Sequence, residues 1–579
     1  MDNKGESMKI RQIYIKGFRG INNLEWGLPE NTIYCLVGPG DSTKSTILDA
    51  IEWILTPRWN MPIFDTDFYN GNVDSPIDIR ITIGGLPEAL LSLDKFGCYT
   101  RGWKDSKIHD EPIEGSEEVI TIRLFVDHSL EPIWTLFTDR NDKPRSISAR
   151  EREALGMIRL GPYVDRQLSW GYGSALTRLT DDLDNIPSIL ADASRSARNT
   201  IDNTKLPKLK EAADKAYSLG IEFGVTPHGE YNPALDPSSS NESAGTITLF
   251  EGRIPAKQSG LGTRRLLTLA LQQNCVKDGS IQLIDEIEQG LEPHRVRHLL
   301  HALYLRLNKN SGDNKCQIFM TTHSRDVIEE LTTNDIFVVR SQNGITETIQ
   351  VNPDLQDTIR AESIALLAKK IIVCEGKTEL GICRALDRNW ANEKDGKSFA
   401  HLGIVPVDGN GTYAPKHALH LRNLGYDVCY FADGDREDLN PNNETLSKSG
   451  VKVILWSENF CTEQRFCHDL IWEALQLFVN LAIEIKGEQI ILPATAAKLK
   501  CKPAQLTHSI DDWLKAGFTQ VDIRDSLSLA ARNDSEGGNW FKRIDSGELL
   551  GSLVYSYLDK IKGTDTQVKI ELLKEWAYA

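Results

Sequence analysis

Two short apolar segments in the C-terminal half of the chain, IIVCEGKTEL and YFADGDRED, carry acidic residues where they end. The first supplies Glu375 and Glu379, and the second supplies Asp433 and Asp435. Runs of β-favouring residues predict buried strands, and water can reach the carboxyl end of such a strand. Carboxylates that gather there repel one another unless a divalent cation lies between them, and oxygen ligands suit Mg²⁺ or Mn²⁺. The pattern therefore predicts a metal site suited to phosphodiester hydrolysis.

Two further residues in the same half are candidates for this chemistry. Glu463 opens a predicted helix after the apolar strand VKVILW, and Lys542 lies in NWFKRID. The aromatic residues before Lys542 can anchor the segment in the core and so fix the cation. A fixed cation stabilises the negative charge that a phosphate gains in the transition state. Lys377 and Arg543 are the alternatives for this role.

A phosphate-binding loop is predicted near the N-terminus. The strand TIYCLVG leads into this loop, which an apolar helix follows. Its residues are Gly38, Pro39, Gly40, Asp41, Ser42, Thr43, Lys44, Ser45 and Thr46. In such loops the backbone N–H groups bind phosphates, Lys44 reaches the β and γ oxygens, and Ser45 meets Mg²⁺. Thr43 stands where a glycine normally precedes the lysine, so either the loop bends differently or the motif is impaired.

The partner motifs of a nucleotide site follow in the chain. The strand SIQLIDE ends in Asp285 and Glu286, which suit the Mg²⁺ shell and the attacking water respectively. Ser259 and Gly260 open a long apolar helix, whose free N–H groups can bind a γ-phosphate across a dimer interface. The strand QIFMTTHS delivers His323 near that phosphate.

Composition limits the class of protein. A chain of 579 residues with 40% hydrophobic and 26% charged residues predicts about three or four globular domains. We expect a cytoplasmic protein without a membrane partner, because no signal-like or membrane-length apolar run is found. The ten cysteines form no Cys-x-x-Cys pair, so neither a zinc site nor a disulfide framework is expected. A net charge of −16 argues against a protein that coats nucleic acid indiscriminately, but it allows a local basic groove.

The chain order suggests four segments: 1–180 and 246–350 as the two parts of a nucleotide-binding domain, 181–245 as a helical insertion, and 351–579 as the carboxylate domain. The insertion is predicted to be either a dimerisation arm or a cap that packs on its own chain. Within it, HGEYNPALDPSSSNESAG is predicted to be a linker without regular structure. The segment Gly403 to Gly411 is predicted to be a strand in the middle of a parallel sheet.

The order of the nucleotide motifs, with Phe18 and Arg19 in the first strand, resembles ABC-type ATPases of the SMC/RecF group. In that group two ATP molecules lie between two heads, and Ser259-Gly260 and His323 correspond to its signature and switch histidine. The region Asp65 to Asp67 lies where a Q-loop would fall but has no Gln. The segments that carry Glu375 and Asp433 resemble a TOPRIM domain.

Together these features resemble an OLD-family (overcoming lysogenization defect) nuclease over essentially the whole chain. The resemblance implies an α/β fold, in which an ABC-type ATPase domain with an inserted helical arm precedes a TOPRIM domain with a Rossmann-like parallel sheet. It implies ATP and Mg²⁺ or Mn²⁺ as cofactors, DNA as substrate and a homodimer or higher homo-oligomer. It also implies a role in antiphage defence, alone or with a partner such as a retron's reverse transcriptase and its DNA.

For the metal site, two ions would be shared by five carboxylates. Glu375, Asp433 and Asp435 would hold one, and Glu379 with Glu463 would hold the other; the assignment to individual ions stays open. The alternative function is an ATP-dependent DNA-binding sensor or scaffold that never cuts. A topoisomerase or primase would need a tyrosine-nucleophile domain or a priming module, and the sequence suggests neither.

Overall fold

The computed structural model describes most of the chain, which forms two compact units, Met1–Pro353 and Asp354–Ala579. The described residues are 8–58, 61–86, 97–140, 144–153, 155–160, 164–170, 174–180, 207–235, 247–274, 280–309, 316–435, 440–532 and 539–579. Among them, none of the helices is both long and apolar enough to span a membrane.

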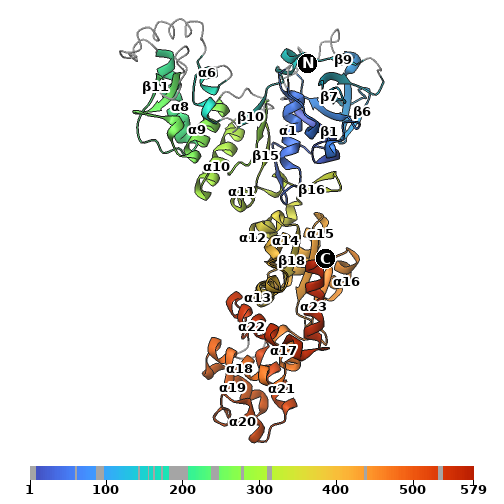
Figure 1. The fold of residues 1–579 in the computed structure, drawn as a ribbon, viewed down its shortest axis with the longest axis vertical. Helices are drawn as coiled ribbons and strands as arrows, with labels where there is room; N and C mark the ends of the chain where they lie inside the picture. The colour runs from blue at the N-terminus through green and yellow to red at the C-terminus, as the bar shows by residue number, and fades with distance from the viewer. Residues whose placement is uncertain are drawn as a thin grey trace. The chain divides into compact units, whose positions relative to one another are not determined.

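The first unit is built on a large mixed sheet whose parallel part carries the nucleotide motifs (Figure 1). The parallel strands follow the order β10 (Met157–Leu160), β14 (Ile281–Ile284), β15 (Gln317–Thr321), β3 (Ile33–Val37) and β16 (Ile336–Gln342). The three strands β14, β15 and β3 are fully buried, which explains their unbroken apolar sequences. Because parallel strands end at the same edge, the loops after these three strands meet there.

Antiparallel strands extend the same sheet. They are β17 (Ile345–Gln350), β2 (Ile21–Gly27), β1 (Lys9–Phe18), β4 (Ile77–Gly84), β7 (Glu117–Val126), β5 (Arg101–Lys104), β6 (Lys107–His109), β8 (Ile133–Phe137) and β9 (Arg145–Ser146). Helix α1 (Lys44–Leu55) follows β3 and buries an apolar face that includes Ile47, Ile51 and Ile54. Shorter helices of this unit are α4 (Ala149–Glu153), α5 (Val164–Gln167), α6 (Ala175–Leu179) and α11 (Arg325–Glu330).

The described part of the insertion packs on its own chain. Helix α8 (Pro207–Glu222) lies beside α9 (Leu261–Asn274), as Figure 1 shows, and a Cβ at Gly220 would lie 3.3 Å from Leu267. Glu222 forms an ion pair with Arg306 of α10 (Pro293–Lys309) at 3.1 Å. Residues 181–206 and 236–246 lie outside the described residues, so a dimerisation arm stays a prediction.

The predicted linker after α8 was wrong in part. Residues Tyr231–Leu235 form strand β11, which pairs with β12 (Ile247–Glu251) in a small antiparallel sheet completed by β13 (Ile254–Pro255). Strand β11 lies at the edge of that sheet, where Pro233 needs no ladder hydrogen bond.

The second unit contains a parallel sheet of the order β19 (Ile404–Asp408), β18 (Lys370–Cys374), β20 (Asp427–Ala432) and β21 (Lys452–Leu455). The prediction of a strand within Gly403 to Gly411 is confirmed, but its predicted central position was wrong because β19 is an edge strand. Helix α13 (Lys377–Glu393) follows β18, and α15 (Ala414–Asn423) follows β19.

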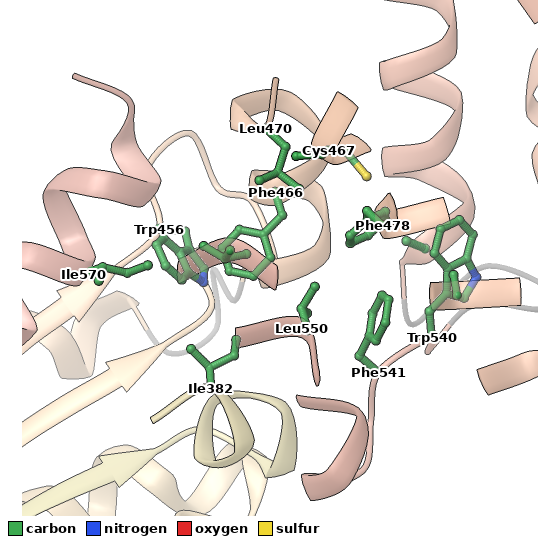
Figure 2. Packing of buried hydrophobic residues seen from close by; sticks show 14 of the residues in the cluster. Ile382, Trp456, Phe466, Cys467, Leu470, Phe478, Trp540, Phe541, Leu550 and Ile570 are labelled. Carbon is green, nitrogen blue, oxygen red and sulfur yellow. The ribbon is translucent and has the colours of Figure 1, made fainter. Parts of the chain in front are cut away.

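Helices complete the second unit. They are α12 (Gln356–Ala361), α14 (Phe399–Leu402), α16 (Asn440–Lys448), α17 (Thr462–Asp469), α18 (Trp472–Lys486), α19 (Glu488–Leu499), α20 (Ile510–Lys515), α21 (Gln520–Ala531), α22 (Ile544–Tyr557) and α23 (Asp565–Tyr578). Figure 2 shows Trp540 and Phe541 against Phe478 of α18, with Phe466 of α17 beside Trp456. This core fixes the segment that carries Lys542.

Helices α13 and α22 cross at very short range. A Cβ at Gly381 of α13 would lie 2.7 Å from the Cα of Gly547 of α22, a distance that real Cβ atoms do not reach. Both positions therefore need glycine. Thr378 of α13 adds a second link, since its hydroxyl donates a hydrogen bond to the carbonyl of Phe541 at 3.0 Å.

Candidate functional site

The phosphate-binding loop is folded around its own lysine. The ammonium of Lys44 donates hydrogen bonds to the carbonyls of Gly38 and Pro39 at 3.0 and 2.8 Å and to Oγ of Ser42 at 3.0 Å. Burial lowers the pKa of Lys44 to about 8, although Asp41 and the acids after β14 oppose the shift. The charged form of the Lys44 amine is thus less stable here than in water, and phosphate oxygens would stabilise it.

The remaining loop residues differ in exposure. Gly38, Ser42 and Lys44 are buried, Pro39, Thr43 and Thr46 are half-buried, and Gly40, Asp41 and Ser45 are exposed. Gly38 has a φ of 146°, and a Cβ there would lie 2.5 Å from the carbonyl oxygen of Val339, so the loop requires glycine at this position.

Thr43 adopts the backbone conformation that glycine favours. Its φ and ψ are 68° and 14°, in the left-handed region. Its hydroxyl donates to the carbonyl of Ser42 at 2.6 Å and lies 3.2 Å from the hydroxyl of Thr346. The sequence left two alternatives, a loop that bends differently and an impaired motif. At residue 43 itself the backbone does not bend differently from a loop with glycine there. A β-branched residue held there costs on the order of 1 kcal/mol or more.

The structure brings Ser45 and Asp285 together. Oγ of Ser45 donates to Oδ1 of Asp285 at 2.9 Å, and the hydroxyl of Thr321 donates to the same oxygen at 2.6 Å. The amide of Glu286, which has a φ of 45°, donates to the Thr321 hydroxyl at 2.8 Å. Thr321 thus connects the two acids after β14 with the end of β15.

Two arginines that the sequence analysis did not predict contact the loop after β14, which carries Asp285 and Glu286. Arg159 of β10 pairs with Asp49 and, at 2.7 Å, with Glu52, both on α1, and its Nη2 lies 3.2 Å from Oδ2 of Asp285. Arg265 of α9 donates to the carbonyls of Asp285 and Glu286 at 2.6 and 2.7 Å. The acids are therefore positioned from both neighbouring elements.

The predicted signature glycine and the predicted switch histidine are both exposed. Ser259 ends a short 3-10 turn, and a Cβ at the exposed Gly260 would meet no described atom within 4 Å. His323 is also exposed, and Glu288 orients its turn by accepting hydrogen bonds from the amide of His323 at 2.6 Å and the hydroxyl of Thr322 at 2.7 Å.

The region where a Q-loop was expected has a structural contact. Asp65–Asp67 forms a short 3-10 turn, and Oδ1 of Asp67 accepts a hydrogen bond from Nε of Arg19 at 2.9 Å. Arg19 follows β1 rather than lying within it, and it also pairs with Asp49.

In the second unit, carboxylates gather where β18 and β20 end. Glu375 and Asp433 are almost buried, at 8% and 6% exposure, and Oε2 of Glu375 accepts a hydrogen bond from the amide of Asp433 at 3.0 Å. The Thr462 hydroxyl at the start of α17 lies 2.8 Å from both Oε1 of Glu379 and Oδ1 of Asp433. Asp435 follows two residues later and is half-buried.

Glu463 lies beside this group, and its carboxylate has no hydrogen-bond partner among the residues that the structure describes. Its side chain is fully buried, and neither carboxylate oxygen has a partner of good geometry, although Cys461 and its own N–H lie close enough to favour the charged form slightly. Burial raises the pKa of Glu463. Burial, together with Asp433, also raises the pKa of Glu379, to about 8.

The charge of Lys542 acts on these acids and favours the ionised forms of Glu379 and Glu463. Burial lowers its pKa, but the charges of Glu463, Glu379 and Asp433 outweigh that effect and raise it. Lys377 is exposed, and the exposed Arg543 pairs with Asp545. We call Glu375, Glu379, Asp433, Glu463 and Lys542 the carboxylate cluster.

The donor chemistry of the carboxylate cluster fits a hard divalent cation, and the uncompensated oxygens of Glu463 are the observation that favours one. The present arrangement does not form a ready ligand set. Among the described residues, no three His, Cys, Asp or Glu side chains are grouped so as to hold a metal ion. Glu379 and Asp433 would have to exchange their contacts with Thr462 for the ion.

One family model matches the part of the chain that carries the nucleotide motifs. Residues 33–329 match the family model described as "AAA domain, putative AbiEii toxin, Type IV TA system". No curated protein matches the sequence.

Three solved structures show low similarity. A Smc head bound to the C-winged helix domain of ScpA has 15% identity, a TM-score of 0.35 and coverage of 59% of this chain and 97% of that chain. A Smc head with an extended coiled coil, bound to the C-terminal domain of ScpA derived from Pyrococcus furiosus, has 14% identity, a TM-score of 0.37 and coverage of 62% and 99%. The recombination mediator protein RecF with ATP has 12% identity, a TM-score of 0.36 and coverage of 60% and 100%.

The predicted α/β ABC-type ATPase fold is therefore confirmed, whereas the TOPRIM assignment stays a prediction. The family match includes the phosphate-binding loop, Ser259-Gly260, Asp285-Glu286 and His323, and it spans more than half of the chain. The chain thus belongs to the family of AAA-domain ATPases described as putative AbiEii toxins of type IV TA systems.

Proposed function

We propose that this ATPase is an ATP-regulated, divalent-metal-dependent DNA endonuclease of the OLD type, whose second unit is a TOPRIM domain that cleaves phosphodiesters. The observation that carries the proposal is the carboxylate cluster. Glu463 is fully buried and has no hydrogen-bond partner within the described part of the chain, and its neighbours are Lys542 and a Glu379 of raised pKa; such an arrangement is costly for stability alone. Such groups are found where a site binds charge.

For the carboxylates we keep the roles that the sequence predicts, with the assignment to individual ions open. Glu375, Asp433 and Asp435 would hold one Mg²⁺ or Mn²⁺ ion, and Glu379 with Glu463 the second. Ions held there would supply an activated water and positive charge at the leaving oxygen. Lys542, fixed by the buried Trp540 and Phe541, stabilises negative charge on the phosphate from a position that the core holds.

The nucleotide half regulates this site. Lys44 binds the phosphates, Ser45 and Asp285 hold the nucleotide's Mg²⁺, and Glu286 orients the attacking water. The exposed Gly260 and His323 complete the site of a second copy, so the active species is a homodimer or higher homo-oligomer. Antiphage defence, alone or beside a partner such as a retron's reverse transcriptase with its DNA, is proposed from the resemblance.

A second candidate function is an ATP-dependent DNA-binding sensor or scaffold that does not cut. The hydrogen bonds that Glu375, Glu379 and Asp433 accept from protein donors favour it, because these acids then serve to shape the fold. In that case the carboxylate cluster would not bind Mg²⁺, and neither DNA cleavage nor ATP hydrolysis would depend on it.

One experiment separates the two candidates. Purified protein is incubated with supercoiled, linear or single-stranded DNA and with Mg²⁺ or Mn²⁺, in the presence and absence of ATP. We expect cleavage that Glu375→Ala and Asp433→Ala abolish while ATP binding is retained. Metal binding without DNA is measured in parallel by calorimetry. Cleavage at the wild-type rate in both variants removes the nuclease assignment.

A further inference from the structure

The loop between β19 and α15 lies against the strand end that carries Glu375. The amide of Gly409 donates to the carbonyl of Cys374 at 2.7 Å, and the amide of Gly411 donates to the carbonyl of Glu375 at 2.8 Å. A Cβ at Gly409 would lie 2.6 Å from the Cys374 carbonyl oxygen, so only glycine allows this approach. The loop therefore has a fixed position at the edge of the sheet where the carboxylate cluster gathers.

An aromatic ring projects from this fixed loop into solvent. Tyr413 ends the 3-10 turn Gly411–Tyr413 and is 57% exposed, which is unusual for a large aromatic side chain. Its ring is stacked on His417, with centroids 6.3 Å apart and an interplanar angle of 18°. His417 is itself buried, so the histidine supports the tyrosine from the protein side. The ring is thus held in place while much of its surface stays open.

A cation lies next to the ring in the sequence. Lys416 is three residues after Tyr413, in the first turn of α15, and residues at this spacing share a helix face. Lys416 is exposed, and its ammonium forms no ion pair with the residues that the structure describes. A supported aromatic ring beside an unpaired cation is the combination that binds single-stranded nucleic acid.

We propose that Tyr413 and Lys416 form a binding site for single-stranded DNA, in which a nucleobase stacks on the tyrosine and the lysine contacts a phosphate. The identity of the ligand as DNA rests on the proposed function. The site places an unpaired nucleotide next to the carboxylate cluster, so it selects melted, frayed or single-stranded segments. Stacking accepts any base, so no sequence preference is expected from this contact.

The test measures binding in EDTA, where cleavage cannot occur. The probe is a single-stranded oligothymidylate with one 2-aminopurine, whose fluorescence is quenched by stacking on an aromatic ring; binding is followed by anisotropy. We expect Tyr413→Ala to lose the quench and to weaken binding about tenfold, and Tyr413→Phe to retain both. Lys416→Gln should keep the quench, weaken binding and reduce the salt dependence by about one ion.

The matched control is Val521→Ala, a truncation at another exposed apolar residue of the same unit, at 65% exposure on α21. It should bind and quench like the wild type. The proposal is overturned if the wild type does not bind the probe, if Tyr413→Ala binds and quenches normally, or if it weakens duplex binding to the same extent. If the protein binds the probe through Tyr413 but never cleaves DNA, the nuclease proposal is wrong and the binding site stands. If the wild type cleaves DNA but Tyr413→Ala does not change probe binding, only the binding site is wrong.

Discussion

Arg159 on β10 reaches Asp285 after β14, with Nη2 and Oδ2 3.2 Å apart, while its other contacts hold Asp49 and Glu52 of α1. One guanidinium therefore ties the helix after the phosphate-binding loop to the acid that pairs with Ser45. Its side chain is 13% exposed, so this cation is largely buried while it compensates three partly exposed carboxylates, of which Asp49 also pairs with Arg19.

Removing this guanidinium should destabilise the first unit. We expect Arg159→Met to lower the free energy of unfolding by about 2 kcal/mol, since Glu52 and Asp285 lose their paired cation and Asp49 keeps only Arg19. Urea denaturation of the full chain measures the change. The matched control is Arg297→Met, which removes an arginine that is 50% exposed and pairs with Asp326 and Glu330. Equal effects of the two substitutions would show that the Arg159 pairs contribute no more than surface pairs, about 1 kcal/mol or less.

Replacing Thr43 should release backbone strain in the phosphate-binding loop. Glycine adopts a φ of 68° without steric cost, and Thr43→Gly places it at this position. We therefore expect a higher ATP turnover from a chain that otherwise hydrolyses ATP slowly. Steady-state phosphate release measures it. Thr43→Ala is the control, because it removes the hydroxyl contacts with Ser42 and Thr346 but keeps a Cβ. A loop that has adapted to threonine would show unchanged or lower turnover in Thr43→Gly.

The lowered pKa of Lys44 predicts a pH-dependent affinity for ATP. The free protein loses the Lys44 proton as the pH rises through about 8, whereas bound phosphates require the charged amine. Affinity should therefore be nearly constant below pH 7 and fall about tenfold from pH 7 to pH 9, with proton uptake on binding. Calorimetry in EDTA, in buffers of different ionisation enthalpy, measures both. Lys44→Arg should bind with no such fall, and a pH-independent wild type would contradict the assigned shift.

Lys542→Met tests the cation of the carboxylate cluster. If the protein cleaves DNA, we expect cleavage to slow by at least about 10²-fold, because a stabiliser of transition-state charge is lost, with DNA binding nearly unchanged. Single-turnover cleavage and anisotropy measure the two quantities. Arg543→Met changes the adjacent, exposed cation and serves for comparison. Normal cleavage by Lys542→Met, or a rate restored at saturating DNA, would move the catalytic cation to Arg543 or Lys377.

The sequence located groups at strand ends but not the side chains that hold them. Apolar runs that end in charge marked Asp285 and Glu375, because that pattern is local. Arg159 and Asp285 are 126 residues apart, and Thr462 and Glu379 are 83 apart, so no local pattern relates them. Their roles arise from the way in which the sheets bring distant strands together.

Two of the differences between the predicted and the observed fold share one cause. The segments with β11 and β19 carry Pro233 and Pro406, and proline is tolerated in edge strands. In the first segment, proline argues against a central strand but allows the edge strand β11. In the second, Pro406 is compatible with the observed edge position of β19 beside β18.

The glycine contact between α13 and α22 has a mechanical consequence. Glu379 lies in the first turn of α13, and α22 begins two residues after Lys542, so each helix carries one charge of the carboxylate cluster at its start. Gly381 and Gly547 leave no gap between the two helices, and the Thr378 hydroxyl donates a hydrogen bond to the carbonyl of Phe541, so one helix has no room to approach the other more closely. The distance between Glu379 and Lys542 therefore depends on the backbone contact between the two helices. A single methyl group added at Gly381 would force the helices apart and change that distance.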